Sequence, residues 1–152
     1  RCRWIHISCM VWISHMSHLL FQVFHTEPQI FLELRINEFI KSKYNKPIRL
    51  NTNGVGSLIN KRNIAPELNG LIATVSISLN NPDPEEYAKL VRSKYGVKSF
   101  QEMIDFAKEC KKYVPNVVMS TVDTTISHEE EKKCKEICDK IGAEYRIRPW
   151  ED

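Results

Sequence analysis

Strand-like and helix-like patterns alternate along the chain after Pro28, and this order constrains the fold more than any other feature. Short strand-like segments, most with a two-residue alternation, are separated by segments with helical spacing. The predicted strands are Ile48–Asn53, Ala73–Asn80, Val117–Asp123 and Glu144–Arg148. Helices are predicted at 30–44, 84–94, 99–113 and 128–141. This order predicts an α/β fold whose strands are parallel neighbours in sequence order.

Capping residues define the predicted helix ends. Asp83 and Ser99 are expected N-caps, and Ser127 with Glu130 has the spacing of a capping box. Gly142 is expected to end the last helix. Residues 54–69 contain no long period, so a loop with one or two short helical turns is predicted there.

Polar side chains occupy one face of three predicted strands. In "TVSISLN", hydroxyl and amide groups alternate with Val75, Ile77 and Leu79, and the first and last strands are similar. The polar positions are Arg49, Asn51, Asn53, Thr74, Ser76, Ser78, Asn80, Glu144, Arg146 and Arg148. Parallel strands covered on both faces are usually continuous apolar runs, and an unsatisfied buried polar group costs about 1–3 kcal/mol. We therefore predict a curved sheet or partial barrel, with helices over the apolar face and a ligand cavity along the polar face.

The carboxyl ends of the parallel strands are the expected ligand-binding edge, and Asn53, Asn80, Asp123 and Arg148 fall there. Two simpler interpretations stay open. One is an antiparallel sheet with one face in water. The other is that Asn53 and Gly54 form a turn without a binding role.

Charge and cysteine content narrow the functional class. The net charge of +3 combines a mildly basic first half with an acidic last third, which gives little support for nucleic-acid binding. Five cysteines and no evident secretory signal favour reduced thiols and a cytoplasmic location. The apolar run over 5–24 has the length of a membrane helix, but three histidines and Gln22 interrupt it, so no membrane span is predicted.

Residues 1–26 form an atypical N-terminal segment, and residues 27–152 form the single predicted domain. The segment is rich in histidine, but the spacing of Cys2, Cys9 and the histidines fits no zinc motif. Cys134 and Cys138 share one helical face, yet two ligands on a regular helix do not make a cluster-binding loop. We therefore predict no metal site on this chain.

Five pieces of the chain, taken in their order and spacing, resemble the later part of the radical S-adenosylmethionine enzyme core. They are Glu27-Pro28, "NTNG", "VSISLN", "PDPEEYAKLVRSKYGVKSFQEMIDFAKECKKYVPNV" and "RIRPW". The most similar group is the TatD-associated radical S-adenosylmethionine proteins, and the resemblance covers residues 27–152.

The resemblance implies a partial, parallel β/α barrel with an enzymatic role. In the complete family protein, a CxxxCxxC loop holds a four-iron, four-sulfur cluster, and the fourth iron binds S-adenosylmethionine. Reductive cleavage of this ligand gives a 5′-deoxyadenosyl radical that abstracts a hydrogen atom from a substrate. The shared core does not define the substrate, and the family name implies an association with a TatD-type nuclease.

The resemblance also implies binding roles for individual residues. Glu27 matches the glutamate of the family's GEP motif, which contacts the methionyl amino group, although Thr26 stands where the family has glycine. Asn51, Thr52 and Asn53 match the third-strand motif beside the methionyl end of S-adenosylmethionine.

Ser78 and Asn80 match the fourth-strand motif near the carboxylate and ribose hydroxyls of that ligand. Arg92 and Arg148 are further candidates for binding the carboxylate or the substrate. We rank Asn53, Ser78 and Asn80 first, because the polar-face argument and the resemblance agree on them.

The cluster motif is missing, since no CxxxCxxC occurs in the 152 residues, and we expect no cluster on this chain. The chain also begins without methionine, and the resemblance begins abruptly at Glu27. Our first interpretation is a fragment of a radical enzyme that keeps part of the S-adenosylmethionine-binding face. The alternative is a non-catalytic α/β binding module derived from that fold. A cofactor-free hydrolase or lyase is a third interpretation, but neither His128 nor Asp123 has an evident catalytic partner.

Overall fold

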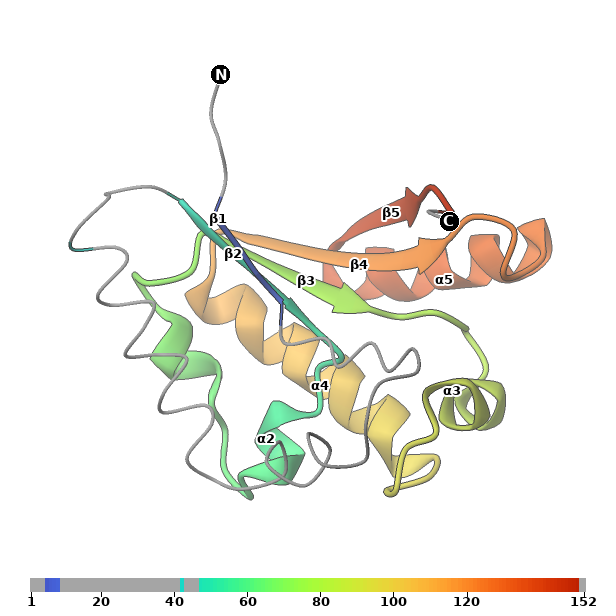
Figure 1. The fold of residues 1–152 in the computed structure, drawn as a ribbon, viewed down its shortest axis with the longest axis horizontal. Coiled ribbons are helices and arrows are strands. Elements are labelled where there is room, and N and C mark those ends of the chain that lie inside the picture. Colours follow the sequence, from blue (N-terminus) through green and yellow to red (C-terminus); the bar gives the residue numbers. More distant parts are fainter. Residues whose placement is uncertain (1–4, 9–41, 43–46, 151–152) are drawn as a thin grey trace, which may run out of the picture.

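The computed structural model describes residues 5–8, 42 and 47–150, and Figure 1 shows how their helices and strands are arranged. The strands are β1 (Ile5–Ser8), β2 (Ile48–Thr52), β3 (Thr74–Ser78), β4 (Asn116–Val122) and β5 (Glu144–Arg148). The helices are α2 (Gly56–Ile59), the 3-10 helix η2 (Ala65–Leu68), α3 (Pro84–Val91), α4 (Lys98–Tyr113) and α5 (His128–Ile141). From β2 onward, every pair of consecutive strands is joined through at least one helix, as predicted.

The strands form one parallel sheet in the order β1-β2-β3-β4-β5. The prediction of four parallel neighbours from β2 to β5 is confirmed, and the antiparallel alternative is wrong. The sequence did not predict β1, which pairs with β2 through Ile5 opposite Ile48. Four alternating residues in "IHIS" are too few to stand out from a segment without a clear period.

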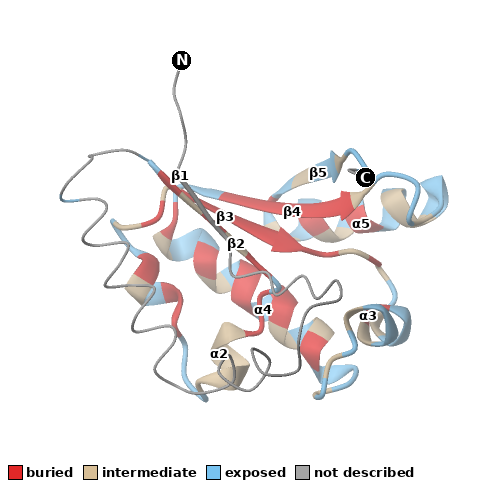
Figure 2. Ribbon diagram, viewed as in Figure 1, coloured by how far each residue is buried: buried red, intermediate tan, exposed pale blue. Residues whose placement is uncertain are grey.

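The apolar side chains of the sheet face the helices. Val75, Ile77 and Met119 are fully buried at the centre, in one core cluster with Met103 of α4 and Cys138 of α5. Figure 2 shows β3 and β4 buried along most of their length and α4 striped with buried residues. Among the described elements, the helices that contribute to this core all lie on one face of the sheet. The structure therefore confirms an α/β fold with the apolar face under helices.

Most of the predicted helix ends are confirmed. Asp83 caps α3 by accepting hydrogen bonds from the backbone N–H groups of the second and third helical residues. Ser127 and Glu130 form the capping box of α5, and Gly142 follows that helix with a left-handed φ of 77°. Ser99 was wrongly predicted as an N-cap, because α4 begins at Lys98 and the Ser99 hydroxyl donates to the Gly96 carbonyl at 2.6 Å.

The strands end earlier than predicted. β2, β3 and β4 end at Thr52, Ser78 and Val122, one or two residues before the expected ends. After Ser78 the chain turns, and Asn80 has a left-handed φ of 58°. Asparagine tolerates this conformation better than most residues, so Asn80, which was predicted to end the strand, belongs to the turn instead.

Two further predictions concern residues that lie mostly outside the described part of the chain. The predicted helix at 30–44 lies outside it except for Ser42, and Glu27 lies outside it entirely. Among residues 5–8, 42 and 47–150, no helix is both long and apolar enough to cross a bilayer.

Candidate functional site

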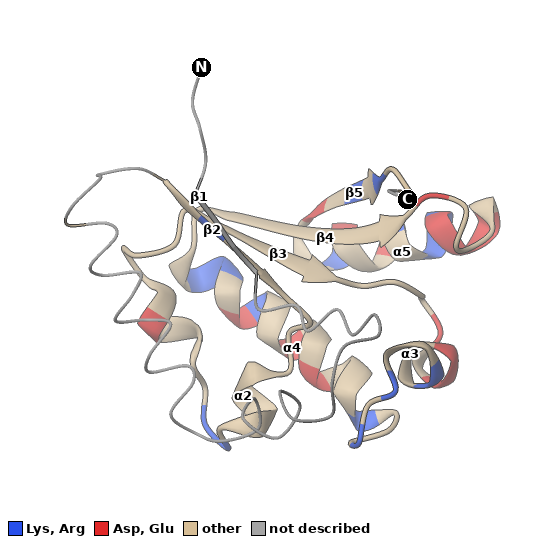
Figure 3. Cartoon of the chain, viewed as in Figure 1, with Lys and Arg blue, Asp and Glu red and all other residues tan. Residues whose placement is uncertain are grey.

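The sheet face opposite the helices collects the polar residues of β2 to β5. Strand register pairs Asn51 with Ser76, Ser78 with Ser120, and Ser120 with Arg146. Paired residues of neighbouring parallel strands project from the same face. We call this surface the polar face, formed by Arg49, Asn51, Ser76, Ser78, Ser120, Glu144, Arg146 and Arg148. Figure 3 shows charged segments on β2 and β5, with the uncharged β3 and β4 between them.

Arg49 is held in a defined position on the polar face. One terminal nitrogen of its guanidinium donates to the Ser76 hydroxyl at 2.9 Å, and Nε donates to Oδ1 of Asn51 at 3.2 Å. Both partners lie farther along the sheet than Arg49 itself, since Arg49 is in register with Thr74. The side chain therefore leans toward the carboxyl end of the strands and over the serines of β3.

The charges on the polar face are unbalanced. Burial lowers the pKa of the Arg49 guanidinium, and the positive charges of Arg146 and Arg148 lower it further. Glu144 acts in the opposite direction and raises the pKa of Arg49. Among the described residues, three guanidinium groups thus share this face with one carboxylate.

Arg148 has an unsatisfied donor. Its Nε is buried and has no hydrogen-bond partner, the only such side-chain atom among the described residues. An unsatisfied buried donor costs about 1–3 kcal/mol, and more when the group is charged. Ser76, Ser78 and Ser120 are buried small residues between β2 and β5, whereas Arg146 is exposed. The face therefore combines guanidinium donors with hydroxyl groups, which is a chemistry suited to oxyanions.

The third-strand motif "NTNG" is divided between two roles. Asn51 lies on the polar face, but Thr52 is buried and in register with Ile77 of the apolar side. The Thr52 hydroxyl accepts from the Gly54 N–H at 3.1 Å, and Oδ1 of Asn53 accepts from the Val55 N–H at 3.3 Å. Both side chains stabilise the turn after β2, which supports the turn interpretation of Asn53 and Gly54.

The turn after β3 separates Asn80 from Ser78. Ser78 is the last residue of the strand, paired with Ser120, whereas Asn80 lies beyond the strand with its positive φ. Strand alternation therefore does not place the Asn80 side chain on the polar face. The next residue, Asn81, is buried and its Oδ1 accepts from the Asp83 N–H at 2.8 Å.

The structure brings together only part of the predicted set. Asn51, Ser78 and Arg148 share the polar face, while Arg92 is exposed at the end of α3. Arg49, Ser120 and Arg146 were not singled out as site residues. Arg49 and Arg146 lay on the predicted polar stripe, and the alternation "VVMSTV" combined with the register would have found Ser120.

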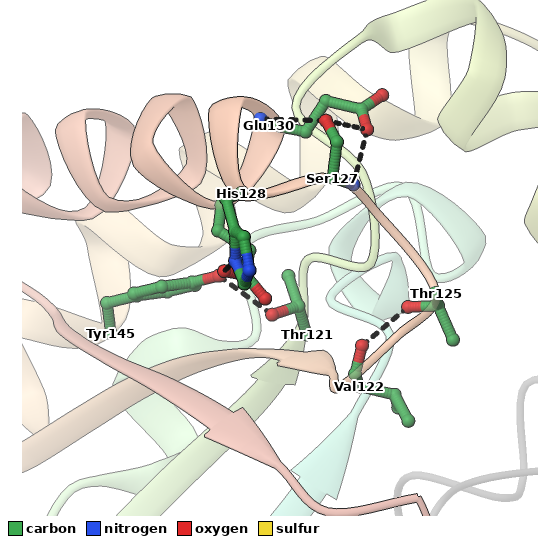
Figure 4. Close-up of polar contacts among 8 residues, drawn as sticks. Thr121, Val122, Thr125, Ser127, His128, Glu130 and Tyr145 are labelled. Carbon is green, nitrogen blue, oxygen red and sulfur yellow. Dashed lines mark hydrogen bonds and ion pairs between the residues drawn. The ribbon is translucent and has the colours of Figure 1, made fainter.

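A second group of polar side chains lies at the junction of β4, α5 and β5 (Figure 4). The hydroxyls of Thr121 and Tyr145 are 2.8 Å apart, and Nδ1 of His128 lies 2.9 Å from a carboxylate oxygen of Glu131. Hydrogen bonding to Glu131 raises the pKa of His128, and burial raises the pKa of Tyr145. The His128 side chain is fully exposed at the first turn of α5, so this is a helix-end ion pair on the surface rather than an enclosed acid–base site.

The cysteines of the described region do not fit an iron–sulfur cluster. Cys110, Cys134 and Cys138 are buried free thiols on α4 and α5. Burial is the main cause that raises the pKa of each thiol to about 12, whereas a ligand must be a thiolate. Within the described residues, no three histidine, cysteine or acidic side chains are grouped to hold a metal ion.

An open groove of about 460 Å³ lies on the helix side of the molecule, near α2 and α4. Its lining mixes charges of both signs, including Lys61, Arg62 and Glu102. None of the predicted site residues lines this groove, so neither the sequence nor the structure assigns it a function.

Comparison with known proteins found no match to this chain among protein-family models, curated proteins or solved structures. The fold and the polar face are therefore the observations from which a function is inferred.

Proposed function

We propose that residues 27–152 form a partial β/α barrel of the radical S-adenosylmethionine type, and that the polar face is part of its ligand-binding surface. The observation that carries this proposal is the combination of four parallel strands in sequence order with the core-forming helices on one face. In a β/α barrel, helices surround the sheet and side chains of the other strand face point inward. The polar residues of β2 to β5 lie on the sheet face opposite the helices, which supports this arrangement.

Three of the predicted residues fit S-adenosylmethionine on the polar face. The unsatisfied Nε of Arg148 is a donor for the methionyl carboxylate. Asn51 and Ser78 supply amide and hydroxyl groups for the remaining polar atoms of the ligand. In the complete family proteins the bound ligand supplies a radical, but the described cysteines do not fit the required cluster. We therefore propose binding without cleavage for this chain.

Titration calorimetry with S-adenosylmethionine tests the proposal. The unchanged chain is compared with the double variant Ser78→Val with Asn51→Leu, and with Lys132→Gln as a control on the exposed surface of α5. Two lost hydrogen bonds at about 0.5–1.5 kcal/mol each predict binding at least about fivefold weaker for the double variant. Equal affinities of the unchanged chain and the double variant, or no binding to either, would refute the proposal.

The second candidate is a non-catalytic binding module, which the buried, protonated thiols favour. Anaerobic incubation with iron, sulfide, dithionite and S-adenosylmethionine separates the two. A module yields no 5′-deoxyadenosine, either alone or when extended by a CxxxCxxC segment encoded upstream. A piece of a radical enzyme yields the product only in the extended form.

A further inference from the structure

We propose that Arg49, Arg146 and Arg148 form an oxyanion-binding site that recognises a phosphate or carboxylate group of a ligand. We call these residues and the serines between them, Ser76 and Ser120, the arginine surface. The inference extends the proposed function by naming a ligand class for the same face, but it does not require S-adenosylmethionine to bind.

Strand register places the three arginines on the same face of the sheet, and the charges of Arg146 and Arg148 act on Arg49. Arg49 comes from β2, and Arg146 and Arg148 come from β5, three strand positions or about 14 Å across. Between them lie the small, buried side chains of Ser76 on β3 and Ser120 on β4. This patch of the sheet therefore has small hydroxyl-bearing side chains at its centre and long cationic side chains on either side.

Hydrogen bonds fix one side of this patch in advance. The bonds from Arg49 to Ser76 and Asn51 use one terminal nitrogen and Nε, which leaves the other terminal nitrogen available for a ligand. A guanidinium that is already oriented loses less conformational freedom when it binds an anion. Arg49 is thus a preorganised donor rather than a freely moving surface charge.

The arginine surface differs from the other charged surfaces of the chain. On the helices, lysines pair with acidic side chains three or four residues away, for example Lys89 with Glu86 and Lys135 with Asp139. Among the described residues, no ion pair includes any of the three arginines. Glu144 is the acidic residue that acts on Arg49, and it lies in an exposed position.

The arginine surface carries positive charges that the nearby acidic side chains do not balance. Neighbouring positive charges raise the energy of the free protein, and the buried Nε of Arg148 has no acceptor within the part of the chain that the structure describes. An oxyanion between β2 and β5 would supply both a compensating charge and acceptor atoms. Guanidinium groups bind phosphate and carboxylate through paired, planar hydrogen bonds, so either group fits this chemistry.

The test uses inorganic phosphate and succinate as separate probes at constant ionic strength, with chloride as the balancing anion. Proton–nitrogen spectra follow the Nε–H signals of the arginines and the backbone signals of β2 and β5 in the unchanged chain, Arg146→Gln and Lys132→Gln. Arg146 is exposed, so its replacement leaves the core intact, and circular dichroism checks that the variant is folded. Lys132→Gln removes one positive charge from the exposed surface of α5.

We expect at least one probe to shift the Arg49 and Arg148 signals in a saturable way, and the probe with the higher affinity identifies the preferred group. Affinity should fall at least tenfold in Arg146→Gln and less than twofold in Lys132→Gln. Absence of saturable shifts with both probes, or equal losses in the two variants, would overturn the inference. If a probe binds while S-adenosylmethionine does not, the inference stands and the proposed function fails.

Discussion

The turn after β2 provides a direct test of the packing between the "NTNG" motif and α4. Gly54 has a left-handed φ of 77°, and a Cβ added there would lie 2.9 Å from Cγ of Met103 and 3.2 Å from its Cα. Backbone strain from an alanine in the left-handed region destabilises the folded state by about 1–2 kcal/mol. This is partly offset by about 0.4–1 kcal/mol, because alanine reduces the conformational entropy of the unfolded chain. Overpacking of the new methyl group against α4 increases the destabilisation by about 1–3 kcal/mol. We expect Gly54→Ala to lower the free energy of unfolding by about 2–3 kcal/mol.

Gly70 is the matched control for this substitution. Its φ of 71° is similar, but an added Cβ meets no atom within 4 Å. Gly70→Ala should therefore lower the free energy of unfolding by only about 1 kcal/mol, from backbone strain alone. Urea unfolding followed by far-ultraviolet circular dichroism gives both values. Losses that agree within about 0.5 kcal/mol, a typical accuracy for comparing such mutants, would refute the claim that Gly54 is required by its contact with Met103.

Two further predictions concern α5 and the buried thiols. Ser127→Ala should lower the free energy of unfolding by about 1 kcal/mol. Glu130→Gln should lower it by less, because glutamine also serves in a capping box. Equal decreases for the two variants in urea unfolding would contradict this prediction. Cys110, Cys134 and Cys138, with pKa values raised from 9.0 to about 12, should resist alkylation at pH 8 in the folded chain and react in urea. Because the unfolded thiols lose their protons first, the free energy of unfolding should also fall as pH rises from about 9 to about 12. Rapid labelling of Cys110 in the folded chain at pH 8, read by mass spectrometry, would contradict its burial. The absence of a fall in the free energy of unfolding over this pH range would contradict it as well.

The order of strands and helices could be predicted from the sequence because each element has strong local signals. The capping box at Ser127 and the alternation through Ile77 are examples that the structure confirms. The ends of β2 and β3 could not be predicted to the residue. Asparagine is compatible both with the polar side of a strand and with a turn, and at Asn53 and Asn80 the turn conformation prevails.

The candidate site was predicted only in part, for a physical reason. Alternation tells which residues of one strand share a face, so it correctly groups Ser76 with Ser78. It gives neither the register between strands nor the direction of a long side chain. The meeting of Arg49 with Ser76 requires both, because the guanidinium reaches past its own register partner Thr74.

The charge of the polar face bears on both proposals at once. S-adenosylmethionine carries a carboxylate, but also a cationic sulfonium and an ammonium group, and a face with three guanidinium groups repels the latter two. Its carboxylate can pair with Arg148, while the rest of the ligand must lie away from Arg49 and Arg146 or be compensated by an acidic side chain such as Glu144. Both proposals therefore place a negatively charged group on the same positive face, and Arg148 is common to the two.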